Sequence, residues 1–210
     1  MSSVAVPQPL ERLAPAEVLD AVAHELRQPL SNIESIAYYL TLVLPRQDEK
    51  VQGQLNRIRQ LVEQSNWILS SGQRLAGSFP PVPEPLDLDQ LIAAAADVPA
   101  ICPGLSHLRL SLAGDLPPVQ LDPRHARALI DTLLMLFRPM AAGSEPVIVR
   151  TSALARGGAS MEIQAPAGAA FGAGSALALE SARSIVQAHG GTLESEADPA
   201  TGIGVRVMLP

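Results

Sequence analysis

Apolar residues in the first third of the chain recur in alternating steps of four and three. One run comprises Val22, Leu26, Pro29, Ile33, Ile36, Leu40 and Val43, and a second comprises Val51, Leu55, Ile58, Val62, Ser65 and Leu69. A repeat of about 3.5 residues is typical of the narrow seam between supercoiled helices. Residues 44–48 (LPRQD) interrupt the pattern, so we expect an antiparallel helical hairpin. One hairpin buries only part of its seam, and two copies would complete a dimeric four-helix bundle.

A proline-rich segment separates this region from the rest of the chain. Residues 79–85 (FPPVPEP) contain four prolines in seven positions, which excludes a helix or a central strand and favours a stiff extended linker. We therefore divide the chain into an N-terminal tail (1–13), a helical hairpin (14–78), a linker (79–86) and a second domain (87–210).

Helical and strand patterns alternate in the second domain. Helices are expected over residues 86–96, 124–137 and 176–188, and strands over 107–112, 146–152, 161–164, 192–195 and 204–209. This order predicts an α/β sandwich with helices on one face of a mixed sheet. The fold class is therefore α plus α/β, with the dimeric bundle followed by the sandwich.

Composition and charge narrow the classes of partner. The formal charge of −6 argues against nucleic acid as the main partner, because phosphate binding needs a basic surface. The lone Cys102 provides neither a disulfide nor a metal site, and it fits a reducing compartment. The sequence has no run of about 20 apolar residues and no signal peptide. We expect a soluble, cytoplasmic protein without a membrane span.

Residues 24–30 (HELRQPL) place candidate chemistry on the first helix. His24 lies about 200° from Val22 and from Leu26, so its imidazole should point away from the seam and offer a nitrogen nucleophile near neutral pH. Glu25 is a candidate to set the tautomer of the ring, and Gln28 lies about 40° away on the same face. An isolated histidine at such a position would be an ordinary surface residue, and the surrounding motif favours the catalytic interpretation.

The chain resembles the two-component sensor histidine kinases. Residues 24–30 are similar to the H-box of that family, in which a histidine precedes an acidic residue and a proline follows five positions after it. Residues 116–122, 182–193 and 202–210 look like parts of its catalytic ATP-binding domain. The likeness covers nearly the whole chain after residue 14. It implies that His24 is the phosphoacceptor and that His189 belongs to a structural turn.

The nucleotide site of that family is degraded in this sequence. Met135, one turn after Asp131, stands where the family has a Mg²⁺-binding asparagine, and a thioether is a poor ligand for this cation. Residues 163–168 (IQAPAG) lack the adenine-binding aspartate, leaving only Gln164 as an acceptor. Ala176 and Ala178 replace two phosphate-loop glycines, and five residues between Gly168 and Gly174 are too few for the family's lid. We therefore expect no cofactor, with ATP and Mg²⁺ bound only if this altered site still works.

Three functions remain compatible with these residues. The favoured one is a histidine phosphotransferase that relays phosphoryl groups between His24 and the aspartates of response-regulator receiver domains. The alternatives are a divergent ATP-dependent histidine kinase and a non-catalytic pseudokinase scaffold that binds a regulator or another histidine kinase. Gln28, where family members often carry Thr or Asn, could in addition orient a water that dephosphorylates the regulator.

Overall fold

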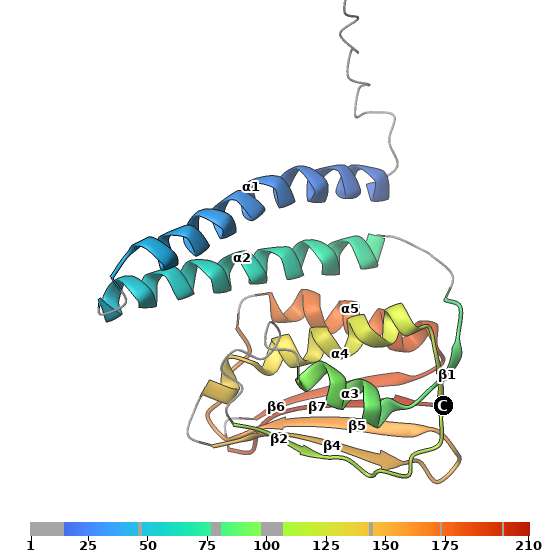
Figure 1. Ribbon diagram of the computed structural model, residues 1–210. Coiled ribbons are helices and arrows are strands. Elements are labelled where there is room, and N and C mark those ends of the chain that lie inside the picture. Colours follow the sequence, from blue (N-terminus) through green and yellow to red (C-terminus); the bar gives the residue numbers. More distant parts are fainter. Residues whose placement is uncertain are drawn as a thin grey trace, which may run out of the picture. The chain divides into compact units, whose positions relative to one another are not determined.

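The computed structural model describes residues 15–45, 48–76, 81–97, 107–142, 145–172, 174–198 and 200–210. The chain divides into two compact units, residues 1–78 and 79–210 (Figure 1). The predicted tail (1–13) and Cys102 lie outside the described residues. None of the helices in the described ranges combines the length and apolarity needed to cross a membrane.

The first unit is an antiparallel hairpin of two long helices, α1 (Pro15–Val43) and α2 (Glu49–Ala76). The prediction of a hairpin is confirmed, and α1 continues through Pro29. The buried apolar contact between the helices is made by two alanines of α1, Ala23 and Ala37, and by Leu55 and Val62 of α2. The small alanine side chains let the two backbones approach closely.

The predicted seam of α1 is left largely exposed by α2. Five of its members are 43–59% exposed, namely Val22, Leu26, Ile33, Ile36 and Val43. The cause is that α1 carries two apolar stripes. One contains Ala23 and Ala37 and faces α2, and the other is rotated from it by roughly 100° around the helix axis. Ile58, Leu61 and Ile68 of α2 are likewise 36–51% exposed. The five residues of α1 and these three of α2 are called the exposed stripe below.

The exposed stripe lies on one side of the hairpin. On both helices its members are rotated from the inward-facing residues in the same sense, and for antiparallel helices this places them side by side. His24 is rotated in the opposite sense, about 100° from Ala23. The hairpin therefore presents an apolar side and, across from it, a side that carries the histidine.

The second unit is a sandwich of one mixed sheet and three helices. The sheet has the strand order β2-β4-β5-β7-β6, with β2 parallel to β4 and the other pairs antiparallel. Its strands are β2 (Leu108–Ser111), β4 (Val147–Ala153), β5 (Ala159–Ala165), β6 (Thr192–Asp198) and β7 (Gly202–Leu209). The helices are α3 (Leu88–Ala96), α4 (Pro123–Phe137) and α5 (Ser175–Ala188), with a short 3-10 helix, η2 (Met140–Ala142).

The three helices cover one face of the sheet (Figure 1), as the alternating pattern predicted. On β5 every second residue is buried, beginning at Ala159 and ending at Ala165, because successive side chains of a strand point to opposite faces. Five large apolar residues of α4 are all buried: Leu129, Ile130, Leu133, Leu134 and Phe137. These side chains form the core between the helices and the sheet.

A second, two-stranded sheet was not predicted. Residues 84–86, assigned to the linker from the sequence, form β1 (Glu84–Leu86), which pairs antiparallel with β3 (Val119–Leu121). Three residues give too short a pattern to identify a strand, and Pro85 argues against one except at an edge. The last part of the predicted linker is thus held by a strand that precedes α4.

The buried Asp122 joins this segment to the helices. Its carboxylate accepts hydrogen bonds from the amides of Val82 (3.0 Å) and Arg124 (2.9 Å), and it pairs with the Arg124 guanidinium at 2.7 Å. The Arg124 side chain, followed by the Val82 amide, holds the pKa of Asp122 well below its usual range. The Asp122 amide donates to Nε2 of His189 at 3.1 Å, and Nδ1 of that ring lies 2.8 Å from the carbonyl oxygen of Ile185. His189 is therefore a structural residue at the end of α5.

Candidate functional site

His24 lies on an open face of α1. Its side chain is exposed, as are those of Glu25 and Gln28. Gln28 follows His24 by four residues and so lies on the same face, whereas Glu25 is rotated by about 100°. No hydrogen bond joins these three side chains to one another within the described part of the chain. The imidazole is therefore open to solvent, and the roles assigned to His24, Glu25 and Gln28 stay predictions.

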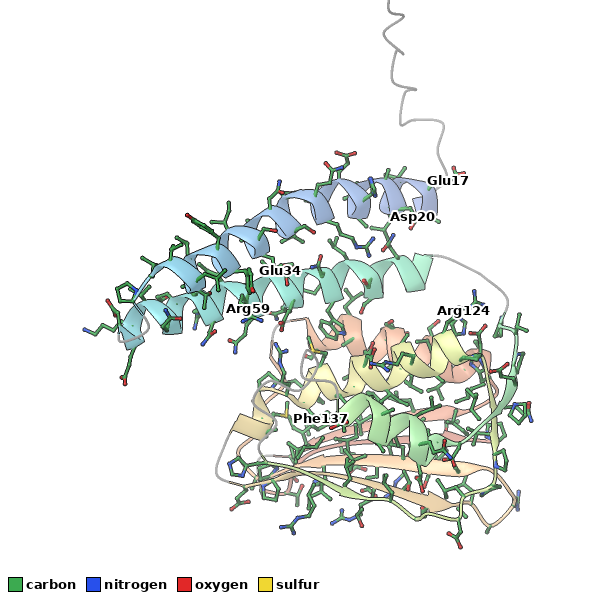
Figure 2. The ribbon with its side chains drawn as sticks, in the orientation of Figure 1. Glu17, Asp20, Glu34, Arg59, Arg124 and Phe137 are labelled. Atoms are coloured by element: carbon green, nitrogen blue, oxygen red, sulfur yellow. The ribbon has the colours of Figure 1, made fainter. Side chains whose placement is uncertain are left out.

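A chain of polar contacts crosses the hairpin beside His24. Arg27 donates from Nη2 to Oγ of Ser70 at 3.1 Å and to Oε1 of Gln73 at 2.5 Å. Gln73 donates in turn from Nε2 to Oδ1 of Asp20 at 2.7 Å. Asp20 projects from α1 toward α2 (Figure 2). These four residues, called the polar clamp below, tie the turns of α1 on either side of His24 to the end of α2.

Sequence reasoning missed the polar clamp. An arginine on a bundle helix is explained as well by surface solubility as by a contact with a partner, so the residue type of Arg27 is only a weak signal. The signal was positional, because Arg27 follows the inward-facing Ala23 by four residues and so falls beside the contact with α2. The Arg27 side chain is accordingly half-buried. The partners on α2 could not be read from α1 alone.

Met135, which the resemblance aligns with a Mg²⁺-binding asparagine, has no oxygen in its side chain. Met135 lies half-buried on α4. Asp131, one turn earlier, accepts from Nε of Arg127 with both carboxylate oxygens at 2.8 Å. The Asp131 carboxylate is therefore paired with the guanidinium of an arginine on its own helix.

The end of β5 offers no acceptor on the side of the helices. Gln164 lies on the opposite face of the sheet, where its Nε2 donates to the carbonyl of Thr201 at 3.2 Å. The residue that faces the helices at this end is the fully buried Ala165. Gln164 therefore does not point to the place where the sequence analysis considered it as an acceptor, and the strand register explains why.

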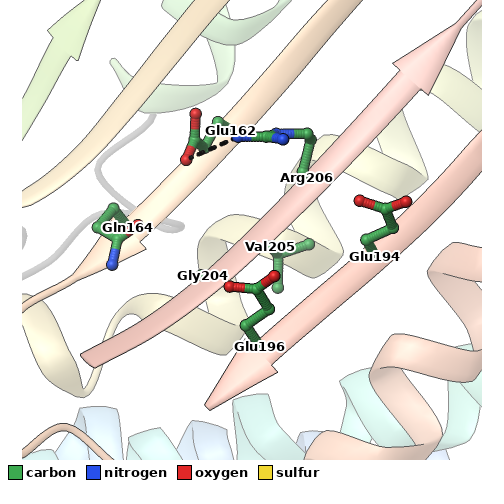
Figure 3. A pocket seen from close by; sticks show the side chains of 7 residues that line it. All are labelled: Glu162, Gln164, Glu194, Glu196, Gly204, Val205 and Arg206. Atoms are coloured by element: carbon green, nitrogen blue, oxygen red, sulfur yellow. Dashed lines mark ion pairs between the residues drawn. The ribbon is translucent and has the colours of Figure 1, made fainter. Parts of the chain in front are cut away.

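Gln164 instead lines a shallow hollow on the open face of the sheet (Figure 3). The hollow lies over Gly204 between three carboxylates and one guanidinium, and its lining is Glu162, Gln164, Glu194, Glu196, Gly204, Val205 and Arg206. Arg206 pairs with Glu162 at 3.6 Å. At about 60 Å³ the hollow is far smaller than the several hundred Å³ of a typical small-molecule site.

The segment between β5 and α5 is packed through an aromatic contact. Phe171 meets the buried Phe137 of α4 edge to face, with ring centroids 6.3 Å apart. Gly174 precedes α5 with φ of 84°, a left-handed conformation that favours glycine. Of the two alanines that the resemblance aligns with phosphate-loop glycines, Ala178 is buried and Ala176 is exposed. The side chains described in this region are thus largely apolar.

Comparison with known proteins identifies the architecture. No family model and no curated protein matches the sequence. Among solved structures, full-length ShkA in complex with AMPPNP is similar with a TM-score of 0.65 and 20% identity, over 94% of this chain and 46% of that one. The histidine kinase AdeS of Acinetobacter baumannii is similar with a TM-score of 0.54 and 15% identity, over 89% and 96%. The fold is that of a histidine kinase core.

This likeness concerns the fold, and the chain spans less than half the length of the ShkA structure. The helical hairpin holds His24 and the polar clamp, and the sandwich holds Met135 and Gln164.

Proposed function

We propose that the chain is a two-component signalling protein that works as a histidine phosphotransferase, with His24 as the phosphoacceptor. The observation that carries the proposal is an exposed His24, followed by Glu25 and Pro29, on the first helix of a histidine kinase core. Fold alone does not fix an activity, so the histidine and its accessibility are the decisive features. The partner is a receiver domain of a response regulator.

The transfer step needs only the imidazole and the partner's aspartyl phosphate. A ring nitrogen of His24 attacks the phosphorus, the new N–P bond forms, and the P–O bond to the aspartate breaks. The aspartate leaves as a carboxylate and the imidazole proton passes to solvent. Return of the phosphoryl group to a second aspartate reverses these steps. Exposure of His24 permits the approach of the phosphoryl group that this chemistry requires.

The sandwich favours phosphotransfer over ATP-dependent autophosphorylation. Met135 offers a thioether where a hard cation needs oxygen, and Asp131 is paired with Arg127. Ala165 provides no acceptor at the end of β5. Met135 and Ala165 each lack a contact that the resemblance implies for the family's nucleotide site, so the phosphoryl group is expected to come from another protein.

The exposed stripe supports a homodimer. Eight large apolar side chains lie 36–59% exposed along one side of the hairpin, and a second hairpin would cover them in a four-helix bundle. His24 lies on the opposite side of α1, so pairing through the stripe leaves the histidine of each copy open to a receiver domain.

The test is phosphotransfer from purified receiver domains that have been loaded with radiolabelled acetyl phosphate. Label should move to the wild-type chain and to His107→Ala, which replaces another exposed histidine, and it should not move to His24→Ala. Incubation with radiolabelled Mg-ATP forms the second arm. Labelling from ATP at His24 would establish the kinase alternative, and labelling in neither arm would leave the scaffold.

A further inference from the structure

The polar clamp contains a cation whose hydrogen bonds go to neutral groups. Arg27 donates to the hydroxyl of Ser70 and to the amide oxygen of Gln73. The carboxylate of the clamp, Asp20, accepts from Gln73 instead. Among the described residues, the positive charge of Arg27 is thus held at the hairpin by neutral acceptors and by no carboxylate. Hydrogen bonds of a guanidinium to an anion are stronger than those to neutral acceptors.

Arg27 is also close to His24 along the helix. The two residues are three positions apart, and side chains at this spacing are neighbours on a helix surface, with Cβ atoms about 5–6 Å apart. The long side chain of arginine can turn about its stem from α2 toward the imidazole. Gln28 is the other neighbour, four positions on, and carries no charge.

Phosphorylation would change the charges around this turn. A phosphoryl group brings a charge of about −1.5 to −2 at neutral pH, and a guanidinium can bind two of its oxygens at once. Asp20, four residues before His24, would repel that group, while its hydrogen bond from Gln73 holds it at α2. Arg27 is therefore the cation placed to receive the phosphoryl group.

We infer that phosphorylation of His24 draws Arg27 away from Ser70 and Gln73 onto the phosphoryl group and thereby opens the polar clamp. The inference rests on the proposed function, because it requires that His24 is phosphorylated. It adds that phosphorylation of the histidine changes the contacts at the end of α2, where Arg27 binds residues on two successive turns. Arg27 is a positioning residue for phosphohistidine, and Ser70 and Gln73 are its resting partners.

The first measurement uses phosphoramidate as a chemical donor, so that no partner protein is needed. The imidazole nitrogen attacks phosphorus, the P–N bond of phosphoramidate breaks, and ammonia leaves with the imidazole proton. The His24→Ala chain identifies the signal of His24 in the ³¹P NMR spectrum. Its pH titration gives the second pKa of the phosphoryl group, which a nearby guanidinium lowers because it stabilises the dianion.

We expect this pKa to be about one unit lower in the wild type than in Arg27→Gln, with Arg27→Lys between them. The control Arg59→Gln removes the same charge from an exposed position of α2 and should titrate like the wild type. Equal titration of the wild type and Arg27→Gln would overturn the role of Arg27. Absence of any phosphohistidine at His24 would instead overturn the proposed function, and this inference with it.

The second measurement follows amide hydrogen exchange in residues 66–76. Phosphorylation should raise exchange there by several-fold in the wild type, because the two hydrogen bonds from Arg27 are lost. In Arg27→Gln exchange should already be raised and change little. A pKa shift with unchanged exchange would show that Arg27 reaches the phosphoryl group without opening the clamp, which refutes that part of the inference.

Discussion

Replacement of two residues of the exposed stripe by serine should dissociate the expected dimer. Ile33 and Ile36 are 44% and 59% exposed in the single chain, and they are adjacent on one side of α1. Full burial of such a side chain is worth about 1.5–3 kcal/mol, so covering the exposed half contributes about 1 kcal/mol. Two residues in each of two protomers give about 4 kcal/mol, or roughly a thousandfold in the dimer dissociation constant.

The assay is a dilution series of the full chain in sedimentation velocity, comparing the wild type with the Ile33→Ser/Ile36→Ser chain. The matched control is Tyr38→Ser/Leu42→Ser, because these side chains are 59% and 60% exposed but point to the opposite side of α1. The control removes similar apolar area and makes similar changes in helix propensity. Equal weakening by the two double variants, or a wild type that stays monomeric at high concentration, would refute the argument.

Two further predictions concern the second unit. Asp122→Ala should lower the free energy of unfolding by about 2 kcal/mol, measured by far-UV circular dichroism. Because the folded state lowers the pKa of Asp122, this loss should be complete above the carboxyl's ordinary pKa of 3.8 and should shrink as the pH falls below it; a loss that is independent of pH would contradict the carboxylate's role. Gly202→Ala places Cβ on the carbonyl oxygen of Ala165 at a φ of 94° and should cost about 3 kcal/mol or more. Gly204→Ala on the same strand, where Cβ would meet Gln164 at 3.4 Å, is the control and should cost much less.

The hairpin offers an internal reference for these measurements. Trp67 of α2 is the single tryptophan of the chain, and neither tyrosine lies beyond residue 39. Tryptophan fluorescence therefore reports on the first unit. The fluorescence transition should stay in place in Asp122→Ala and Gly202→Ala, and a shift equal to that of the circular dichroism signal would show that these variants act beyond their own unit.

Periodic patterns predicted most of the architecture. A repeat of 3.5 residues predicted the two long helices, and the alternation after the linker predicted the mixed sheet with helices on one face. The repeat does not show which surface each apolar stripe packs against. Alanines such as Ala23 make the contact with α2, because close backbone approach selects small side chains, while the larger Ile33 and Ile36 remain exposed.

The remaining differences arise from contacts between distant segments. Short strands such as β1 have no period, and Pro85 within it argues for a linker. The bonds of Asp122 to Val82 and to His189 join positions that are 40 and 67 residues apart, so no local pattern includes them. At the candidate site, the motif singles out His24, whose role stays a prediction, whereas the contacts of Arg27 depend on the three-dimensional pairing of the two helices.

The β1–β3 ladder determines where this chain can be cut and rejoined. A chimaera that transplants the sandwich from residue 87 onward would leave behind β1 and the Val82 amide. The transplanted unit would then keep the buried Asp122 carboxylate without one of its donors and β3 without its only neighbour in that sheet. A junction placed before residue 81 keeps both with the sandwich. A junction on the hairpin side of the prolines should therefore be tolerated better than one immediately before α3.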